Sequence, residues 1–193
     1  MPPERIATAR LLLRRFTRRD IGSLTEAVQA SLPALNEWLP WAHPGYKRDD
    51  AANYVRDSLE AWKEGRAYDF AIRKRGEARR HIGNISVWPV SRLTRTGEIG
   101  YWIRTDDTSN GIATEATAAI VKMAFDDLGY HKLVLRIALG NRQSERVAEK
   151  LGFSREGVLR EELLIRGRWV DHTLFSLLDR EYDEASQRLT ADS

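Results

Sequence analysis

The sequence has no cysteine among its 193 residues, and this absence excludes three kinds of chemistry. A disulfide scaffold, a zinc site built on thiolates and a cysteine nucleophile all need thiol side chains. The 6 prolines and 13 glycines are scattered, so no Pro/Gly-rich linker separates two domains. We therefore expect one domain over residues 1–182 and a polar C-terminal tail over residues 183–193.

Long apolar runs are also absent. The three leucines at 11–13 are followed at once by Arg14 and Arg15, far short of the roughly 18 residues that a membrane span needs. Residues 1–6 lack the apolar stretch of a secretory signal. We expect a cytoplasmic protein with no membrane contact.

Charge of one sign is not in excess, because 31 basic and 28 acidic residues give a net charge of only +3. No strand combines aromatic and basic residues as an RNA-binding sheet does, so we expect no direct contact with nucleic acid. One basic cluster surrounds a predicted turn, where we expect solvated side chains that an acidic partner would attract. Its members are Arg73, Lys74, Arg75, Arg79 and Arg80.

Apolar periodicity predicts an α+β (mixed α/β) fold, with a central mixed, mostly antiparallel sheet flanked by helices. The predicted strands cover residues 7–16, 68–73, 81–90, 97–104 and 132–139, and a last hairpin covers residues 153–178. The predicted helices cover residues 21–32, 50–64, 111–128 and 142–151. Thr17 and Asp20 have capping-box spacing before the first helix. Two prolines predict a loop over residues 33–44.

Several catalytic motifs are missing. The chain has no P-loop, no Gly-x-Gly-x-x-Gly and no Gly-x-Ser-x-Gly, which excludes the commonest nucleotide-binding and hydrolase signatures. Its four histidines, His43, His81, His131 and His172, lack metal-ligand spacing. We expect structural roles for them and no metal site.

One polar loop leaves two interpretations open, an anion site or only a tight turn before a helix. Residues 105–110 lead into the strongest helix through Gly111, Ile112 and Ala113. The first N–H groups of a helix have no partner within it, and they lie at the positive end of its dipole. Such a helix entry suits a phosphate group.

The segments around this loop resemble the GNAT acetyltransferases. GEIGYWI at residues 97–103, GIATEA at residues 111–116 and the run from Asn141 to Phe153 carry the resemblance. Within these enzymes, WLPW at residues 38–41 and GRWVD at residues 167–171 resemble the branch that acetylates ribosomal-protein N-termini.

The resemblance extends over about residues 7–182 and implies the GNAT acyl-CoA acyltransferase fold. It also implies transfer of an acetyl group from acetyl-CoA, as co-substrate, to a primary amine by direct attack in a ternary complex. The N-terminal α-amino group of a ribosomal protein is the implied acceptor. A small amine (an antibiotic, polyamine or amino acid) and a silent acetyl-CoA-binding protein remain alternatives. Relatives are often dimers, and the last hairpin is the expected contact.

The resemblance implies which residues bind acetyl-CoA. They are Trp102, Ile103, Arg104, Ser109, Asn110, Gly111, Ile112, Ala113, Thr114, Asn141 and Ser144. Thr108 departs from the family, which usually has Gln or Arg there, so a weaker affinity for coenzyme A is expected. Ala148 stands where many relatives have a tyrosine that acts as the acid. The resemblance implies that Ser144 forms the hydrogen bond to the departing thiolate instead.

The implied general base is Glu98, on the strand that leads to the cofactor, with Asp69 in reserve. Backbone N–H groups near residues 102–104 are expected to polarise the thioester carbonyl. The predicted acceptor-binding residues are Trp38, Trp41 and Tyr68.

Overall fold

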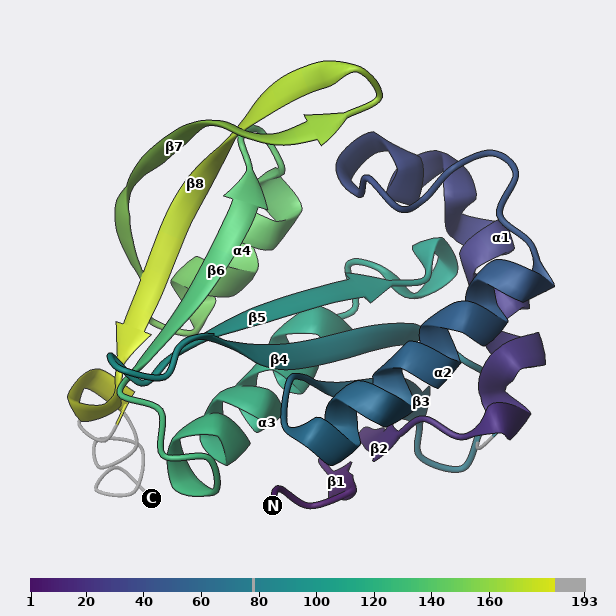
Figure 1. Cartoon of the computed structure of the whole chain (residues 1–193), viewed down its shortest axis with the longest axis horizontal. Helices are drawn as coiled ribbons and strands as arrows, with labels where there is room; N and C mark the ends of the chain where they lie inside the picture. The colour runs from purple at the N-terminus through teal and green to yellow at the C-terminus, as the bar shows by residue number, and fades with distance from the viewer. Residues whose placement is uncertain (78, 183–193) are drawn as a thin grey trace.

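The computed structural model describes residues 1–77 and 79–182, so the predicted tail over 183–193 lies outside the described residues. One sheet of eight strands has the order β1-β2-β3-β4-β5-β6-β8-β7 (Figure 1). Its strands are β1 (Arg5–Ala7), β2 (Leu11–Arg15), β3 (Tyr68–Lys74), β4 (Gly83–Ser91), β5 (Thr96–Ile103), β6 (Lys132–Ala138), β7 (Ser154–Ile165) and β8 (Arg168–Leu178). The helices are α1 (Ile21–Trp38), α2 (Arg48–Glu64), α3 (Ile112–Asp126) and α4 (Arg142–Lys150), with 3₁₀ turns at Arg18–Asp20 and Thr105–Asp107. The predicted α+β class is confirmed.

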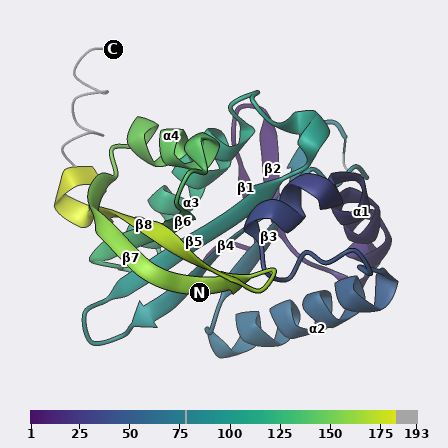
Figure 2. The ribbon, with the colours of Figure 1, turned by 90° about the horizontal axis from the view of Figure 1, so that it is seen from above.

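Helices cover both faces of this sheet. α3 and α4 lie on one face, and α1 and α2 lie on the other (Figures 1 and 2). Ile112, Ala116 and Ile120 of α3 are buried in one core, and Leu24 and Val28 of α1 are buried in a second. Burial of each large apolar side chain contributes about 1.5–3 kcal/mol, so these two cores fix the helices on the sheet. Across the described residues, no helix is long and apolar enough to cross a membrane.

β5 and β6 pair in parallel, whereas every other neighbouring pair of strands is antiparallel. Their pairing covers only residues 96–98 of β5 and residues 132–134 of β6. Beyond these residues the two strands run apart, as Figure 1 shows. The sheet therefore opens between the C-terminal halves of β5 and β6.

The first predicted strand, residues 7–16, is wrong in part. The structure has two strands there, β1 and β2, which pair antiparallel with Ile6 opposite Leu13. Between them, the Thr8 N–H donates to the Leu11 carbonyl at 3.0 Å, and the Thr8 hydroxyl accepts from the Leu11 N–H at 2.9 Å. These local bonds of a threonine side chain compete with the strand ladder and form a turn.

The predicted loop over residues 33–44 is also wrong in part, because α1 continues through Pro33 to Trp38. A proline inside a helix removes one backbone hydrogen bond and costs about 3 kcal/mol. Leu35 follows Val28 on the buried side of the helix, and the Leu39 N–H still donates to the Leu35 carbonyl at 2.9 Å. Packing of this apolar side offsets the cost of the proline.

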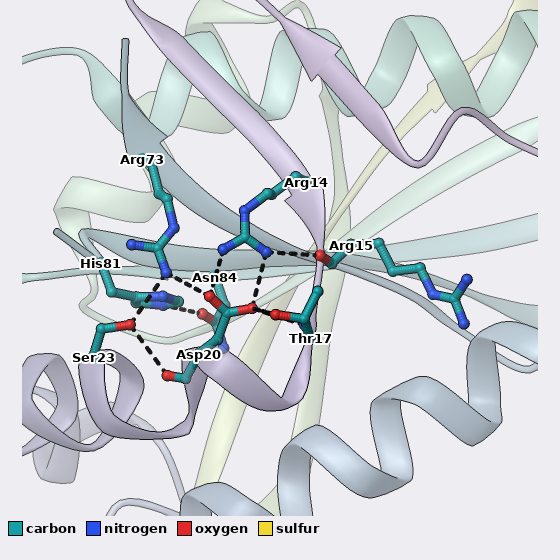
Figure 3. Close-up of polar contacts among 8 residues, drawn as sticks. All are labelled: Arg14, Arg15, Thr17, Asp20, Ser23, Arg73, His81 and Asn84. Carbon is teal, nitrogen blue, oxygen red and sulfur yellow. Dashed lines mark hydrogen bonds and ion pairs between the residues drawn. The ribbon is translucent and has the colours of Figure 1, made fainter. Parts of the chain in front are cut away.

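Buried charges lie between β2, β3 and the start of α1 (Figure 3). The Asp20 carboxylate accepts from the Thr17 N–H at 2.7 Å, so this part of the predicted capping pair is confirmed. The same carboxylate binds Arg14 and also Arg73, at 2.7 Å from the Arg73 Nη2. Arg73 is only 2% exposed, so the expectation of a solvated side chain is wrong. Its place in β3 directs it toward the face that α1 covers.

Two other members of the predicted basic cluster also have partners. Lys74 and Arg80 each lie 2.7 Å from a carboxylate oxygen of Asp107, which is buried in the loop between β5 and α3. Arg75 and Arg79 are exposed, as expected. The basic turn therefore anchors the loop that precedes α3.

The last hairpin is confirmed. β7 and β8 pair antiparallel, with Ile165 opposite Arg168 across a turn at residues 166–167. The homodimer expected through this hairpin stays a prediction.

Candidate active site

A cleft of about 580 Å³, here the first cleft, opens at the N-terminal end of α3. Its walls come from the end of α1, from β5, from the loop before α3 and from α4. Nine of the eleven residues predicted to bind the cofactor line it: Trp102, Ile103, Ser109, Gly111, Ile112, Ala113, Thr114, Asn141 and Ser144. Arg104 and Asn110 lie outside the lining, which also includes the cations Arg146 and Lys150.

The N-terminal end of α3 brings backbone N–H groups to the first cleft. Gly111 is the N-cap of α3, with no side-chain cap and a φ of 74°, a left-handed conformation that favours glycine. Among the described residues, the N–H groups of residues 109–114 donate no hydrogen bond to the protein. They lie at the positive end of a 15-residue helix, so together they can hold an anion of two phosphates.

Arg10 and Glu115 stabilise the loop that precedes α3. The Arg10 guanidinium donates to the Asn110 carbonyl at 2.9 Å and to the Glu115 carboxylate at 2.6 Å. The Thr8 hydroxyl donates to the same carboxylate at 2.5 Å. Asn110 therefore helps to shape the loop with its carbonyl, although its side chain is outside the lining of the cleft.

The open side of β5 contributes further N–H groups. The Arg104 N–H donates to the Ile82 carbonyl at 2.8 Å, on the β4 side of β5. Successive N–H groups of a strand point to opposite sides, so those of Ile103 and Tyr101 point away from β4. They therefore face the gap where β5 and β6 have run apart.

Ser144 lies in the first turn of α4 and lines the first cleft. Its N–H donates to the Asn141 side chain at 3.2 Å, so Asn141 is the N-cap of the helix. The Tyr101 hydroxyl is buried next to the Ser144 side chain without reaching hydrogen-bond geometry. Burial raises the pKa of Tyr101 to about 12, so this phenol stays protonated at neutral pH. The helix has Ala148 and no phenol, but β5 supplies one.

A second cleft, of about 500 Å³, opens on the face of the sheet that α1 and α2 cover. Its floor follows from the register of three antiparallel strands. Asp69, Ser86 and Gly100 lie side by side across β3, β4 and β5, and Asn84 lies opposite Trp102 two residues further on. Alternate residues of a strand share a face, so all five residues lie on the face that lines this cleft.

The second cleft is acidic and aromatic. Asp69 is 8% exposed and lies in the lining together with Asp50. Burial raises the pKa of the Tyr54 hydroxyl, and the nearby Asp69 charge raises it further, whereas the polar Ser86 and Asn84 side chains beside it act in the opposite direction. Two carboxylates beside aromatic rings suit a cationic amine.

Three residues, Leu39, Tyr101 and Trp102, line both clefts. The clefts therefore meet at β5, beside the gap toward β6. The Trp102 ring also packs against Trp41, with ring centroids 6.2 Å apart. A group held in the first cleft can contact a group held in the second at this junction.

Glu98, the predicted base, lies at the last paired position of β5 and β6. Its side chain is buried, and its two oxygens accept from Arg136 of β6 at 2.8 and 2.7 Å. Arg136 also binds Glu162 of β7. Glu98 lines neither cleft, whereas Asp69 lines the second.

The predicted acceptor-binding residues are divided among three places. Trp41 lines the second cleft, and Trp38 lines the first, because α1 extends to it. Tyr68 lines neither cleft and packs edge-on against Trp62, with ring centroids 5.2 Å apart. Residues that the sequence reasoning missed include His43, Tyr46, Tyr54, Asn84 and Trp88. The strand register places Asn84 and Trp88 in this cleft, whereas His43, Tyr46 and Tyr54 come from α2 and the segment before it. No group of three or more His, Asp or Glu that could hold a metal occurs in the described part of the chain.

Comparison with known proteins agrees with this geometry. The family described as "Acetyltransferase (GNAT) domain" matches residues 10–154. YdaF of Bacillus subtilis (strain 168) is 28% identical over 180 residues, covering 90% of this chain and 93% of that protein. The [ribosomal protein uS5]-alanine N-acetyltransferase of Escherichia coli (strain K12) is 27% identical over 185 residues, covering 92% of each chain.

A solved structure of Mycobacterium smegmatis RimJ in complex with CoA-disulfide superposes with a TM-score of 0.84 at 26% identity. It covers 94% of this chain and 88% of that chain. The family match spans most of the chain, and relatives named ribosomal-protein acetyltransferases match along nearly all of it. The chain therefore belongs to the GNAT acetyltransferases and is an acetyl-CoA-dependent N-acetyltransferase.

Proposed function

We propose that this enzyme acetylates the N-terminal α-amino group of a protein, with acetyl-CoA in the first cleft and the amine in the second. The observation that carries this proposal is the shared wall at Leu39, Tyr101 and Trp102. In this arrangement the N–H groups of residues 109–114 hold the diphosphate, and Arg146 and Lys150 add positive charge. The thioester end then lies at the junction, next to the amine.

The attacking amine must be neutral. An α-amino group has a pKa near 8, so about a tenth of it is already neutral at pH 7. The base therefore has a modest task, which a carboxylate can perform directly or through water. We assign this task to Asp69, which lines the amine cleft. Glu98 is the second candidate, because both of its oxygens are bound to Arg136.

The thioester carbonyl is polarised by the N–H groups of Tyr101 and Ile103, which face the gap beside β5. The departing thiolate accepts hydrogen bonds from Ser144 and Tyr101. A thiol has an ordinary pKa of about 8.5. A phenol whose pKa is about 12 does not give its proton away to such a thiolate. Tyr101 therefore acts as a hydrogen-bond donor, and the proton that restores the thiol comes from water.

The relatives support a protein N-terminus as the acceptor. One that matches 92% of this chain is named a ribosomal-protein alanine N-acetyltransferase. A small-molecule amine is the competing acceptor. The test is incubation with labelled acetyl-CoA and three acceptor sets: ribosomal proteins, short peptides with free N-termini, and small amines. We expect label on protein or peptide N-termini, and less label with the Asp69→Asn variant. Label on small amines alone would overturn the proposal.

A further inference from the structure

We infer that the Asn84 carboxamide, oriented by His81, binds the first carbonyl oxygen of the acceptor, so that the second cleft selects an amine next to a carbonyl group. This inference rests on the proposed function and deepens it. It separates a peptide N-terminus from an alkyl amine or polyamine, which has no such oxygen.

His81 and Asn84 form a buried pair behind the second cleft (Figure 3). The His81 Nε2 lies 2.6 Å from the Asn84 Oδ1, and His81 is 1% exposed. Asn84 lines the second cleft, whereas His81 does not. The histidine therefore acts on the cleft only through the asparagine.

Neighbouring groups decide which atom carries the proton. An amide oxygen only accepts hydrogen bonds, so the His81 Nε2 that faces it must be the N–H donor. Burial and the nearby Arg73 cation keep the imidazole neutral and lower its pKa to about 4, although the Asn84 bond and the Asp20 charge oppose this shift. With its oxygen bound to His81, Asn84 can offer the cleft only its NH₂ group, which also lies beside the Tyr54 hydroxyl.

The rest of the cluster keeps His81 in place. Its ring packs against Phe16 and Trp102, with centroids 5.9 and 5.8 Å away and interplanar angles of 31° and 32°. Arg73, whose charge acts on His81, is itself held by Asp20 at 2.7 Å. Packing in the core therefore fixes the orientation of the Asn84 amide. Trp102, which contacts His81, also lines both clefts at their junction.

The second cleft then presents a donor and a carboxylate along the same face of the sheet. Asp69 of β3 lies opposite Ser86 of β4. Asn84 lies two residues from Ser86 on the same strand, which is about 7 Å along it. An amine bound to Asp69 and its neighbouring carbonyl oxygen bound to Asn84 can span that distance with two hydrogen bonds of about 2.9 Å. A carboxylate next to the amine would be repelled by Asp69 and Asp50, so a free amino acid fits less well.

The test uses a single-atom change in the acceptor. The probes are an alanine-initiated decapeptide and the same peptide with its first carbonyl oxygen replaced by sulfur, a weaker acceptor. For the wild-type enzyme we expect kcat/KM to fall about 3- to 10-fold on the sulfur peptide, the worth of one neutral hydrogen bond. Asn84→Ala and His81→Phe should bring this ratio close to one, and His81→Gln, which keeps a donor, should partly restore it.

Asn36→Ala is the matched control, since Asn36 of α1 lines neither cleft, and it should keep the wild-type ratio. Equal rates of the wild-type enzyme on both peptides would overturn the inference while leaving the proposed function intact. So would an Asn84→Ala enzyme that keeps the wild-type ratio. Transfer to neither peptide would instead refute the protein acceptor, and this inference with it.

Discussion

Arg136 binds both carboxylate oxygens of Glu98, at 2.8 and 2.7 Å. Glu98 is the last residue of β5 that pairs with β6, and Arg136 lies two residues beyond its partner Val134, so the pair joins the two strands where they separate. A carboxylate that accepts two charge-assisted hydrogen bonds is held rigidly and has little freedom to take a proton from a substrate. We therefore regard the pair as the structural clamp of the opening between the strands.

The first prediction separates the two carboxylates. Asp69→Asn should lower kcat/KM about 10- to 100-fold at pH 7, with partial recovery at pH 9, where the acceptor amine is neutral without help. Glu98→Gln should mainly lower the melting temperature, because it removes one charge from the clamp. The measurement is a pH–rate profile of both variants. If Glu98→Gln alone shows the low-pH loss, the base is Glu98.

The second prediction concerns the thiolate. Ser144→Ala and Tyr101→Phe should each lower kcat about 3- to 10-fold, and Kd for acetyl-CoA should change little, because each removes one hydrogen bond to the leaving group. Asn141 caps α4 through the Ser144 backbone N–H, so Ser144→Ala leaves that cap in place. Steady-state kinetics and calorimetry measure the two quantities. A loss confined to Kd would contradict the assignment.

The third prediction compares two glycines. Gly111 and Gly129 both have positive φ, 74° and 64°, so an aspartate introduced at either meets similar backbone strain. Only Gly111 lies in the first cleft. Gly111→Asp should raise Kd for acetyl-CoA at least 10-fold through charge repulsion, whereas Gly129→Asp should leave it unchanged. Equal affinities in the two variants would place the diphosphate elsewhere.

The fourth prediction concerns acid stability. Burial raises the pKa of Asp20, but hydrogen bonds from Arg14 and Thr17 outweigh burial and hold this pKa at about 2. A lowered pKa stabilises the folded state above the ordinary value near 3.8, by about 2 kcal/mol, and this contribution is lost as pH falls toward 2.

Asp20→Asn should therefore lower the free energy of unfolding at pH 7 by about 3–5 kcal/mol, since it leaves Arg73 buried without its counter-ion. The deficit relative to wild type should shrink between pH 4 and pH 2. Urea unfolding measures both. Glu4→Gln is the control, because Glu4 pairs with Arg15 at the surface and should contribute less than 1 kcal/mol. A pH-independent deficit would contradict the lowered pKa.

The helix entry at Gly111 and the helix start at Asn141 could be predicted from sequence because their signals are local, and both residues are N-caps in the structure. The role of Ser144 was expected only from the family resemblance. The order of strands and helices also followed from apolar spacing. The exceptions were a turn at Thr8 and a helix that continues through Pro33, where side-chain bonds and packing outweigh local preference.

The second cleft could not be predicted in the same way. Asp69, Asn84 and Trp102 meet only through the register of three strands, which periodicity does not specify. Arg73 is a second example. Its charge predicted a solvated side chain, but its ion pair with Asp20, 53 residues earlier in the chain, holds it in the interior.

The central claim is that the N–H groups before α3 hold the diphosphate of acetyl-CoA. Amide NMR titration tests it most directly, with acetyl-CoA and with S-acetylpantetheine, which lacks the diphosphate. The account predicts large shifts of the Ser109, Gly111, Ile112 and Ala113 amide signals with acetyl-CoA and small ones with S-acetylpantetheine. Equal shifts with both compounds, or none at these four amides, would contradict it.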